Sequence, residues 1–202
     1  MLGTNEQLFL LINASPNASP AIVYAAELIA SKLIYLIPLL LVALWIWGPP
    51  TRRTGLAACT IAAALALGTN QLVGLLWFER RPFMIGLGRT LVAHAPENSF
   101  PSDHTTFILT VGISLIMTRA APTWGKVAIV LGALVGWARI YLGLHFPVDI
   151  LASALIAGLF GMIAALLASP VARWIMPVVE WVYEGALETF RLPSRFFPRR
   201  ED

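Results

Sequence analysis

Three short segments of this chain combine residue types that bind and transfer phosphate. They are Arg81-Pro82, then Pro101-Ser102-Asp103-His104, and then Arg139, His145 and Asp149 in the spacing Arg-x5-His-x3-Asp. Arginine binds phosphate oxygens through a planar, permanently charged fork. Histidine is a base and a nucleophile near neutral pH. Together these residue types indicate phosphoryl transfer.

The anion-binding part of this chemistry falls on Arg81, Arg139, Ser102 and Asp103. The two arginines are spaced to act as a phosphate clamp. Ser102 and Asp103 stand where the N-cap of a helix is expected, and the free N–H groups of a helix N-terminus attract anions. Arg139 lies within an apolar stretch, where an unpaired charge is costly and marks a functional residue.

The proton-transfer part falls on His145, Asp149 and His104. Asp149 follows His145 by four residues, so across the first turn of a helix its carboxylate can bind the second ring nitrogen of the histidine. His104 can protonate a leaving oxygen. Taken alone, Ser102 is explained as an N-cap and Asp149 as a complement to a helix dipole. The ordered combination of all three segments favours the catalytic interpretation.

Apolar helices must position these residues, because the chain is 58% hydrophobic and only 12% charged. That balance is typical of a membrane protein and excludes a soluble enzyme or a nucleic-acid-binding module. We predict an all-α, polytopic membrane bundle with about five spans, at 21–47, 55–78, 103–119, 124–143 and 148–168. Cys59 lies in one of them and is expected to be a small core residue.

The ends of the chain are predicted to lie at the membrane interface. Residues 1–14 carry no Lys or Arg, so they do not read as a secretory signal and are expected to form a short interfacial helix. Residues 170–202 show an amphipathic helical pattern. We therefore predict one domain over 1–202, with a transmembrane core at 21–168. Whether the first segment itself spans the membrane stays open.

Loop charges predict the orientation. Five spans place loops 48–54 and 119–126 and the carboxyl tail on one side, which holds nine basic residues: Arg52, Arg53, Arg119, Lys126, Arg173, Arg191, Arg195, Arg199 and Arg200. The loops of the other side hold three: Arg80, Arg81 and Arg89. The positive-inside rule puts the more basic side in the cytoplasm. All the candidate catalytic residues then face outward.

The three segments resemble the motifs of the type 2 phosphatidic acid phosphatase superfamily, which includes lipid phosphatases and vanadium haloperoxidases. Within this superfamily, the chain is most similar to undecaprenyl-pyrophosphate phosphatases of the bacitracin-resistance type. The similarity is seen in residues 81–86, residues 94–104 and Leu11-Ile12-Asn13-Ala14. The resemblance implies that His145 forms a phosphohistidine, that Asp149 orients it and that His104 is the acid. It also implies that Arg81, Ser102 and Arg139 hold phosphate and that no metal or other cofactor is needed.

Two positions depart from the family pattern. Gly74 stands where the first motif has a lysine, and Ala138 stands where the third has a serine. Arg80 is one candidate to replace the lysine. Lys32 in the first span is another, although it is equally explained by an ion pair with Glu27. His94 and Glu97 are possible accessory residues of the same outward loop.

The resemblance implies hydrolysis of undecaprenyl pyrophosphate to undecaprenyl phosphate on the outer face of a bacterial plasma membrane. Such an enzyme recycles the carrier lipid of peptidoglycan synthesis and confers bacitracin resistance. The same chemistry on phosphatidic acid or phosphatidylglycerol phosphate is an alternative. A catalytically silent protein that binds pyrophosphate lipids is another, although binding alone would not need a nucleophile with its own carboxylate. Lipid preference, oligomeric state and source organism stay open at this point.

Overall fold

A computed structural model of the chain describes residues 2–191, 193 and 197–198, and all of its regular structure is helical. The helices are α1 Thr4–Ile12, α2 Pro20–Lys32, α3 Leu36–Trp47, α4 Arg53–Leu76, α5 Asp103–Met117, α6 Pro122–Tyr141, α7 Pro147–Pro170 and α8 Met176–Thr189. Short 3-10 turns lie at Leu33–Tyr35, Pro50–Arg52 and Pro82–Ile85, and a π-helical turn at Val171–Ile175 joins α7 to α8. Arg195, Arg199 and Arg200, which entered the charge count, lie outside the described residues.

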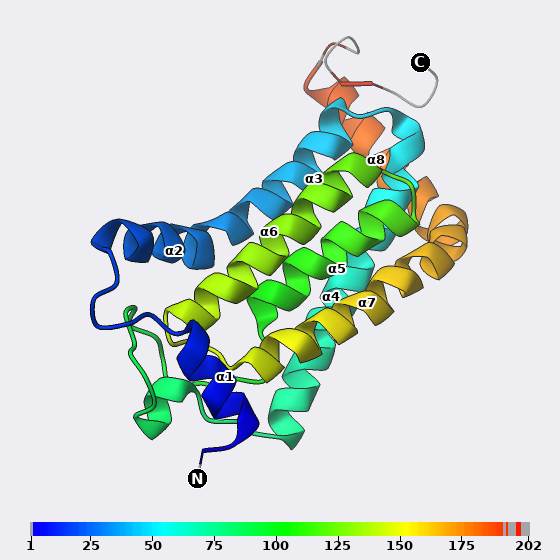
Figure 1. The fold of residues 1–202 in the computed structure, drawn as a ribbon. Coiled ribbons are helices and arrows are strands. Elements are labelled where there is room, and N and C mark those ends of the chain that lie inside the picture. The colour runs from blue at the N-terminus through cyan, green and yellow to red at the C-terminus, as the bar shows by residue number, and fades with distance from the viewer. Residues whose placement is uncertain (1, 192, 194–196, 199–202) are drawn as a thin grey trace.

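The predicted helical membrane bundle is confirmed (Figure 1). Four helical segments are long and apolar enough to cross a bilayer: Pro20–Trp47, Pro50–Leu76, Pro122–Tyr141 and Pro147–Thr189. The remaining predicted span, α5, has 15 residues. At 1.5 Å per residue it is about 22 Å long, which is shorter than a hydrocarbon core of roughly 30 Å. α5 by itself is therefore too short to cross the hydrocarbon core.

α5 is the central helix and packs against α4, α6 and α7. Close approach of α5 and α6 depends on Gly112 and Gly125. A Cβ added at Gly112 would lie 2.9 Å from the carbonyl oxygen of Gly125, and one added at Gly125 would lie 2.6 Å from that of Gly112. Small residues at helix crossings let backbones meet in this way in membrane bundles. Cys59 packs in the core beside α5, as predicted.

The first predicted span is not one straight helix. Figure 1 shows α2 lying at an angle to α3, with the change of direction at Leu33–Tyr35. Pro38 explains the break, because its ring clashes with the carbonyl of the residue four positions earlier, Ile34, and it has no N–H to donate. The helix restarts at Leu36, so that Pro38 falls in the first turn, where the missing N–H is harmless.

The carboxyl-terminal helix is partly different from the prediction. The helical run continues through Pro170 by a wide turn, and α8 then packs one face on α3 and α4, with Tyr183 edge-on to Trp45. Trp174 and Trp181 point outward as an amphipathic helix requires. Glu180 belongs to the predicted amphipathic segment but is only 8% exposed, because it lies on the face that packs inward.

Arg53, one of the basic residues counted for the orientation, does not lie at the surface of its loop. The side chain is fully buried at the start of α4, and its guanidinium lies 4.5 Å from the centre of the Tyr183 ring. Cation–π contact with a desolvated ring is favourable, so this arginine helps to hold α8 against α4.

The candidate residues gather at the opposite end of the bundle from loop 48–52. Figure 1 shows α1, loop 77–102 and the start of α7 together at that end. Phe9 of α1 packs edge-on against Phe146, with ring centres 5.4 Å apart, which anchors the amino-terminal helix over the turn that carries His145.

Candidate active site

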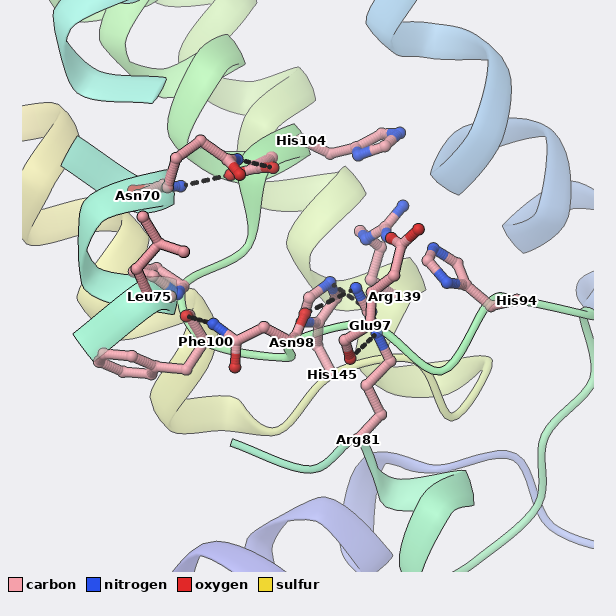
Figure 2. A pocket seen from close by; sticks show the side chains of 14 residues that line it. Asn70, Leu75, Arg81, His94, Glu97, Asn98, Phe100, His104, Arg139 and His145 are labelled. Carbon is pink, nitrogen blue, oxygen red and sulfur yellow. Dashed lines mark hydrogen bonds between the residues drawn. The ribbon is translucent and has the colours of Figure 1, made fainter. Parts of the chain in front are cut away.

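A cavity of about 410 Å³ opens at this end of the bundle, between the last turns of α4, the start of α5 and loop 77–102 (Figure 2). Its lining residues are Asn70, Gln71, Gly74, Leu75, Arg81, His94, Glu97, Asn98, Phe100, Pro101, Asp103, His104, Arg139 and His145. The structure thus brings together residues of all three predicted segments, which lie up to 64 positions apart in the case of Arg81 and His145.

The turn that carries His145 is built by Gly143 and by the start of α7. Gly143 has φ +84°, and a Cβ there would lie 2.2 Å from the carbonyl oxygen of Arg89, so the turn can press against loop 89–90 only with glycine. Phe146 is the N-cap of α7, and its N–H donates to Asp149 Oδ2 at 2.8 Å. The capping interaction therefore holds the carboxylate beside His145.

Asp149 Oδ2 accepts two further hydrogen bonds that set the state of His145. His145 Nδ1 lies 3.2 Å from this oxygen, and the Ser99 hydroxyl donates to it at 2.5 Å. On the other side of the ring, Arg81 Nη1 lies 3.2 Å from Nε2. Because a guanidinium only donates, Nε2 must accept, and the proton of the neutral ring sits on Nδ1. The lone pair of Nε2 is therefore directed at the guanidinium of Arg81, which lines the cavity together with His145.

Burial, with the positive charges of Arg139 and Arg81, holds the pKa of His145 well below its ordinary value. Desolvation disfavours the charged form of an imidazole, and neighbouring cations disfavour it further. The ring is therefore neutral at physiological pH, which is the form that a nucleophile needs.

The two arginines play different structural parts. Arg81 donates to the carbonyl oxygens of Glu97, Asn98 and Leu144 at 3.2, 3.0 and 3.1 Å, so it ties loop 77–102 to the His145 turn. Arg139 is buried and donates once, to the Ala30 carbonyl at 3.3 Å. Its Nε has no hydrogen-bond partner among the described residues. A buried cation with an unused donor at a cavity wall is suited to an anionic ligand.

His104 and Asp103 share the first turn of α5 but point to different partners. Asp103 accepts from Asn70 Nδ2 at 2.8 Å and from Gln71 Nε2 at 3.0 Å. These bonds pin the start of α5 to α4 and occupy both carboxylate oxygens. His104 lines the cavity and extends at its edge in Figure 2. Asp103, predicted as a phosphate ligand, thus fixes the helix start that carries His104.

A profile of the PAP2 superfamily matches residues 54–172, which include every residue of the three motifs. The chain belongs to the PAP2 superfamily. It is 31% identical to undecaprenyl-diphosphatase BcrC of Bacillus subtilis (strain 168) over 183 residues, which are 91% of this chain and 93% of that protein. It is also 38% identical to YbjG of Escherichia coli (strain K12) over 162 residues, 80% of each chain.

The fold is also found in a solved structure. The crystal structure of Aquifex aeolicus LpxE superposes with a TM-score of 0.67 at 24% identity, covering 81% of this chain and 95% of LpxE. With four segments able to span a bilayer, the chain is a multi-pass membrane protein.

The two departures from the PAP2 motifs have structural explanations. At Gly74, an added Cβ would lie 2.8 Å from Asn98 Nδ2, so the loop side chain occupies the space in which a lysine would begin. Asn98 accepts from the Glu79 N–H at 2.7 Å and donates to the Phe100 carbonyl at 2.5 Å. Ala138 is buried between α6 and α2, in a cluster with Ala26 and Ala30.

Neither predicted substitute for the PAP2 lysine reaches the cavity. Among the described residues, Arg80 lines a separate pocket beside α1, with Glu6 and Ile85. The direction of the chain explains this, because successive side chains of the extended segment before Pro82 point to opposite sides and Arg81 takes the inward one. Lys32 and Glu27 are exposed on α2 and line no part of the cavity that the structure describes.

Ser102 is buried behind the cavity wall rather than in it. Its N–H donates to Ser153 Oγ at 2.9 Å, and its hydroxyl lies 3.2 Å from that of Thr105. Ser102 is the N-cap of α5, without a side-chain capping bond. The structure thus places it where it joins α5 to α7, and the phosphate contact expected of it stays a prediction.

His94 and Glu97 both line the cavity, on the side opposite Leu75 in Figure 2. Burial lowers the pKa of His94, so its ring is neutral at physiological pH. The Nδ1 atom of His94 lies 3.1 Å from the carbonyl oxygen of Ala95. Because a carbonyl oxygen can only accept a hydrogen bond, the proton of the neutral His94 ring is on Nδ1. Both accessory residues therefore stand within the polar part of the cavity.

Sequence reasoning missed several residues of the site, among them Ser99, Asn70 and Asn98. Ser99 lies three residues before Ser102 in a Pro-rich turn, where a serine normally suggests only a loop. Asn70 sits in the middle of an apolar span, and a buried amide at membrane depth was the available signal. Asn98 had no signal, because its partners are backbone groups 19 and 2 residues away.

Proposed function

We propose that this protein hydrolyses undecaprenyl pyrophosphate to undecaprenyl phosphate and inorganic phosphate, and that it thereby recycles the carrier lipid and confers bacitracin resistance. The observation that carries the proposal is the neutral His145 ring at the wall of the cavity, with Nδ1–H on Asp149 and Nε2 bound by Arg81, the cation that with Arg139 can take up the phosphate oxygens when the substrate enters. The relative BcrC is named an undecaprenyl-diphosphatase.

In the first step, the Nε2 lone pair of His145 forms a bond to the terminal phosphorus. The bond from phosphorus to the bridging oxygen breaks, and its electron pair leaves with undecaprenyl phosphate, to which His104 donates a proton. Asp149 stabilises the positive charge that develops on the imidazole. Arg81 and Arg139 bind the oxygens of the transferring group, whose negative charge must be held in place for in-line attack.

In the second step, water hydrolyses the phosphohistidine. His104 removes a proton as the water oxygen attacks phosphorus, the bond from phosphorus to Nε2 breaks, and the electron pair returns to the ring. Inorganic phosphate leaves, and His145 is again neutral. The fixed tautomer matters here, because a proton on Nε2 would block the next cycle.

We further propose that the cavity faces the outside of a bacterial plasma membrane. The basic residues at the other end of the bundle support this orientation. We also propose that 1–202 act as one domain, because Phe9 of α1 packs on Phe146 and Met176 joins the cluster around Ala58 of α4.

The function is tested by phosphate release from purified protein in EDTA with undecaprenyl pyrophosphate, phosphatidic acid and phosphatidylglycerol phosphate compared side by side. We expect the pyrophosphate to have the highest kcat/KM and His145→Ala to be inactive though folded. Preference for either monophosphate lipid would replace the proposed substrate, and residual turnover by His145→Ala would refute the phosphohistidine. No turnover of any lipid, with retained binding, would favour a silent binding protein.

Orientation is tested by single cysteines in a Cys59→Ser background. A cysteine at Ala93 in the outward loop should react with an impermeant thiol reagent in intact cells, whereas one at Thr51 should not. The reverse labelling pattern would place the cavity in the cytoplasm.

A further inference from the structure

The catalytic cavity has a polar end and an apolar end. In Figure 2 His94, Arg139 and His145 lie on one side, and Leu75 and Phe100 lie on the other, beside Asn70, whose amide is engaged by Asp103. A polyprenyl pyrophosphate has the same division, with its charge in the two phosphates and an apolar chain attached to one of them. The apolar end of the cavity is therefore matched to the first part of the lipid chain.

The apolar end is also where the cavity reaches the surface of the protein. Leu75 lines the cavity and yet is 83% exposed. Phe100 lines both this cavity and a neighbouring apolar pocket formed with Trp77 and Val148. A wall residue that is mostly exposed marks a mouth, so the mouth opens between the last turn of α4 and Phe100.

From this mouth an apolar strip runs down α4 into the bilayer. Leu65, Leu72 and Leu75 are exposed and recur at helical spacing, so they share one face of the helix. Gly68 falls on the same face, and an added Cβ there would meet nothing within 4 Å. From Leu75 to Leu65 the strip is about 15 Å long.

Exposed leucines are ordinary on the lipid-facing side of a membrane helix, and α7 has several, including Leu155 and Leu166. The strip on α4 differs in one respect: it continues into the catalytic cavity through Leu75, whereas Leu155 and Leu166 do not line the cavity. Continuity with the site, rather than exposure, distinguishes it.

We infer that the polyprenyl chain of the substrate leaves the cavity between Leu75 and Phe100 and lies along Leu72 and Leu65 of α4. Leu75 is then a specificity-determining residue, which selects pyrophosphates that carry an apolar chain. The inference rests on the proposed function, because it assigns a path to that substrate's chain.

The experiment compares Leu75→Asn with the matched control Leu155→Asn, which is 76% exposed on α7. Each is assayed in detergent with undecaprenyl pyrophosphate, with the shorter farnesyl pyrophosphate and with p-nitrophenyl phosphate, which has no lipid chain. Losing one apolar contact from a binding surface typically costs about tenfold in kcat/KM. We expect Leu75→Asn to lose roughly that much on both prenyl substrates, mainly through KM, and to lose much less on p-nitrophenyl phosphate, whereas Leu155→Asn should keep its activity on all three.

A second variant tests the path along the helix. Leu65→Asn, farther down α4, should weaken undecaprenyl pyrophosphate more than farnesyl pyrophosphate. Equal losses on all three substrates, or no loss in either α4 variant, would overturn the inference. So would the same loss in Leu155→Asn. Wild-type protein that turns over no prenyl pyrophosphate would instead refute the proposed function, so the two failures are distinguishable.

Discussion

Placing the missing PAP2 lysine at Gly74 should reduce activity rather than improve it. A side chain at this position meets Asn98 Nδ2 at 2.8 Å from the Cβ alone, so even Gly74→Ala must displace the Asn98 amide. The side-chain amide of Asn98 accepts from the Glu79 N–H and donates to the Phe100 carbonyl. The backbone carbonyl of Asn98 accepts from Arg81 at 3.0 Å. Moving Asn98 therefore loosens the loop that positions Arg81.

The size of the effect follows from the bonds that are lost. Two neutral hydrogen bonds contribute about 1 to 3 kcal/mol together. Replacing a helical glycine by alanine returns about 0.4 to 1 kcal/mol by restricting the unfolded chain. The midpoints of these two ranges leave a net loss of about 1.3 kcal/mol for Gly74→Ala, which corresponds to a factor of roughly 10 in kcat/KM. Gly74→Lys should lose more, because its longer side chain must also pass Asn98.

The assay is kcat/KM on undecaprenyl pyrophosphate beside the Tm in detergent. Gly158→Ala is the matched control, since Gly158 is also a helical glycine, on α7, with nothing within 4 Å of the added Cβ. It should keep full activity and gain slightly in Tm. In the double variant Gly74→Lys/Asn98→Ala, the losses should be less than additive, because the clash is removed. Full activity in Gly74→Lys would show that the Asn98 side chain does not block a lysine side chain at position 74 in the working enzyme.

Three more outcomes follow from the geometry around His145. His104→Ala should lower kcat on the lipid pyrophosphate by at least about 10²-fold. The loss of kcat should be much smaller on p-nitrophenyl phosphate, because its leaving group needs no acid. An equal loss of kcat on both substrates would exclude the acid role of His104. Ser99→Ala removes a 2.5 Å hydrogen bond to Asp149, and a hydrogen bond to a charged group contributes about 1.5 to 3 kcal/mol. We therefore expect kcat to fall about 10- to 100-fold with KM little changed. An unaltered kcat would mean that Asp149 does not need the Ser99 hydrogen bond to orient His145. Because burial, Arg139 and Arg81 lower the pKa of His145, the acid limb of kcat/KM should lie below the ordinary histidine value of about 6.5. Removing a cation favours the protonated ring and raises its pKa, so Arg81→Gln should move that limb to higher pH; a limb that stays in place would refute the electrostatic coupling.

Much of the architecture was predictable because apolar length and charge distribution are local properties of the sequence. Long uncharged stretches can only be satisfied as helices in a bilayer. The order of the spans then places Arg81, His104 and His145 at one end of the bundle, whatever the details of packing. Breaks inside helices were less predictable: the Pro38 break and the π-helical turn at 171–175 depend on how neighbouring helices absorb a lost hydrogen bond.

The sequence by itself determined the class of protein, the end of the bundle that carries the chemistry and the residue types of the reaction. Only the tertiary structure decided the tautomer of His145, the engagement of Asp103 by Asn70, the outward turn of Arg80 and the closure of the lysine space by Asn98. The physical reason is that helical spacing fixes which residues share a face, whereas a loop side chain takes its direction from distant partners. Loop 77–102 is held by contacts to α4, α7 and the His145 turn, and no local pattern encodes those contacts.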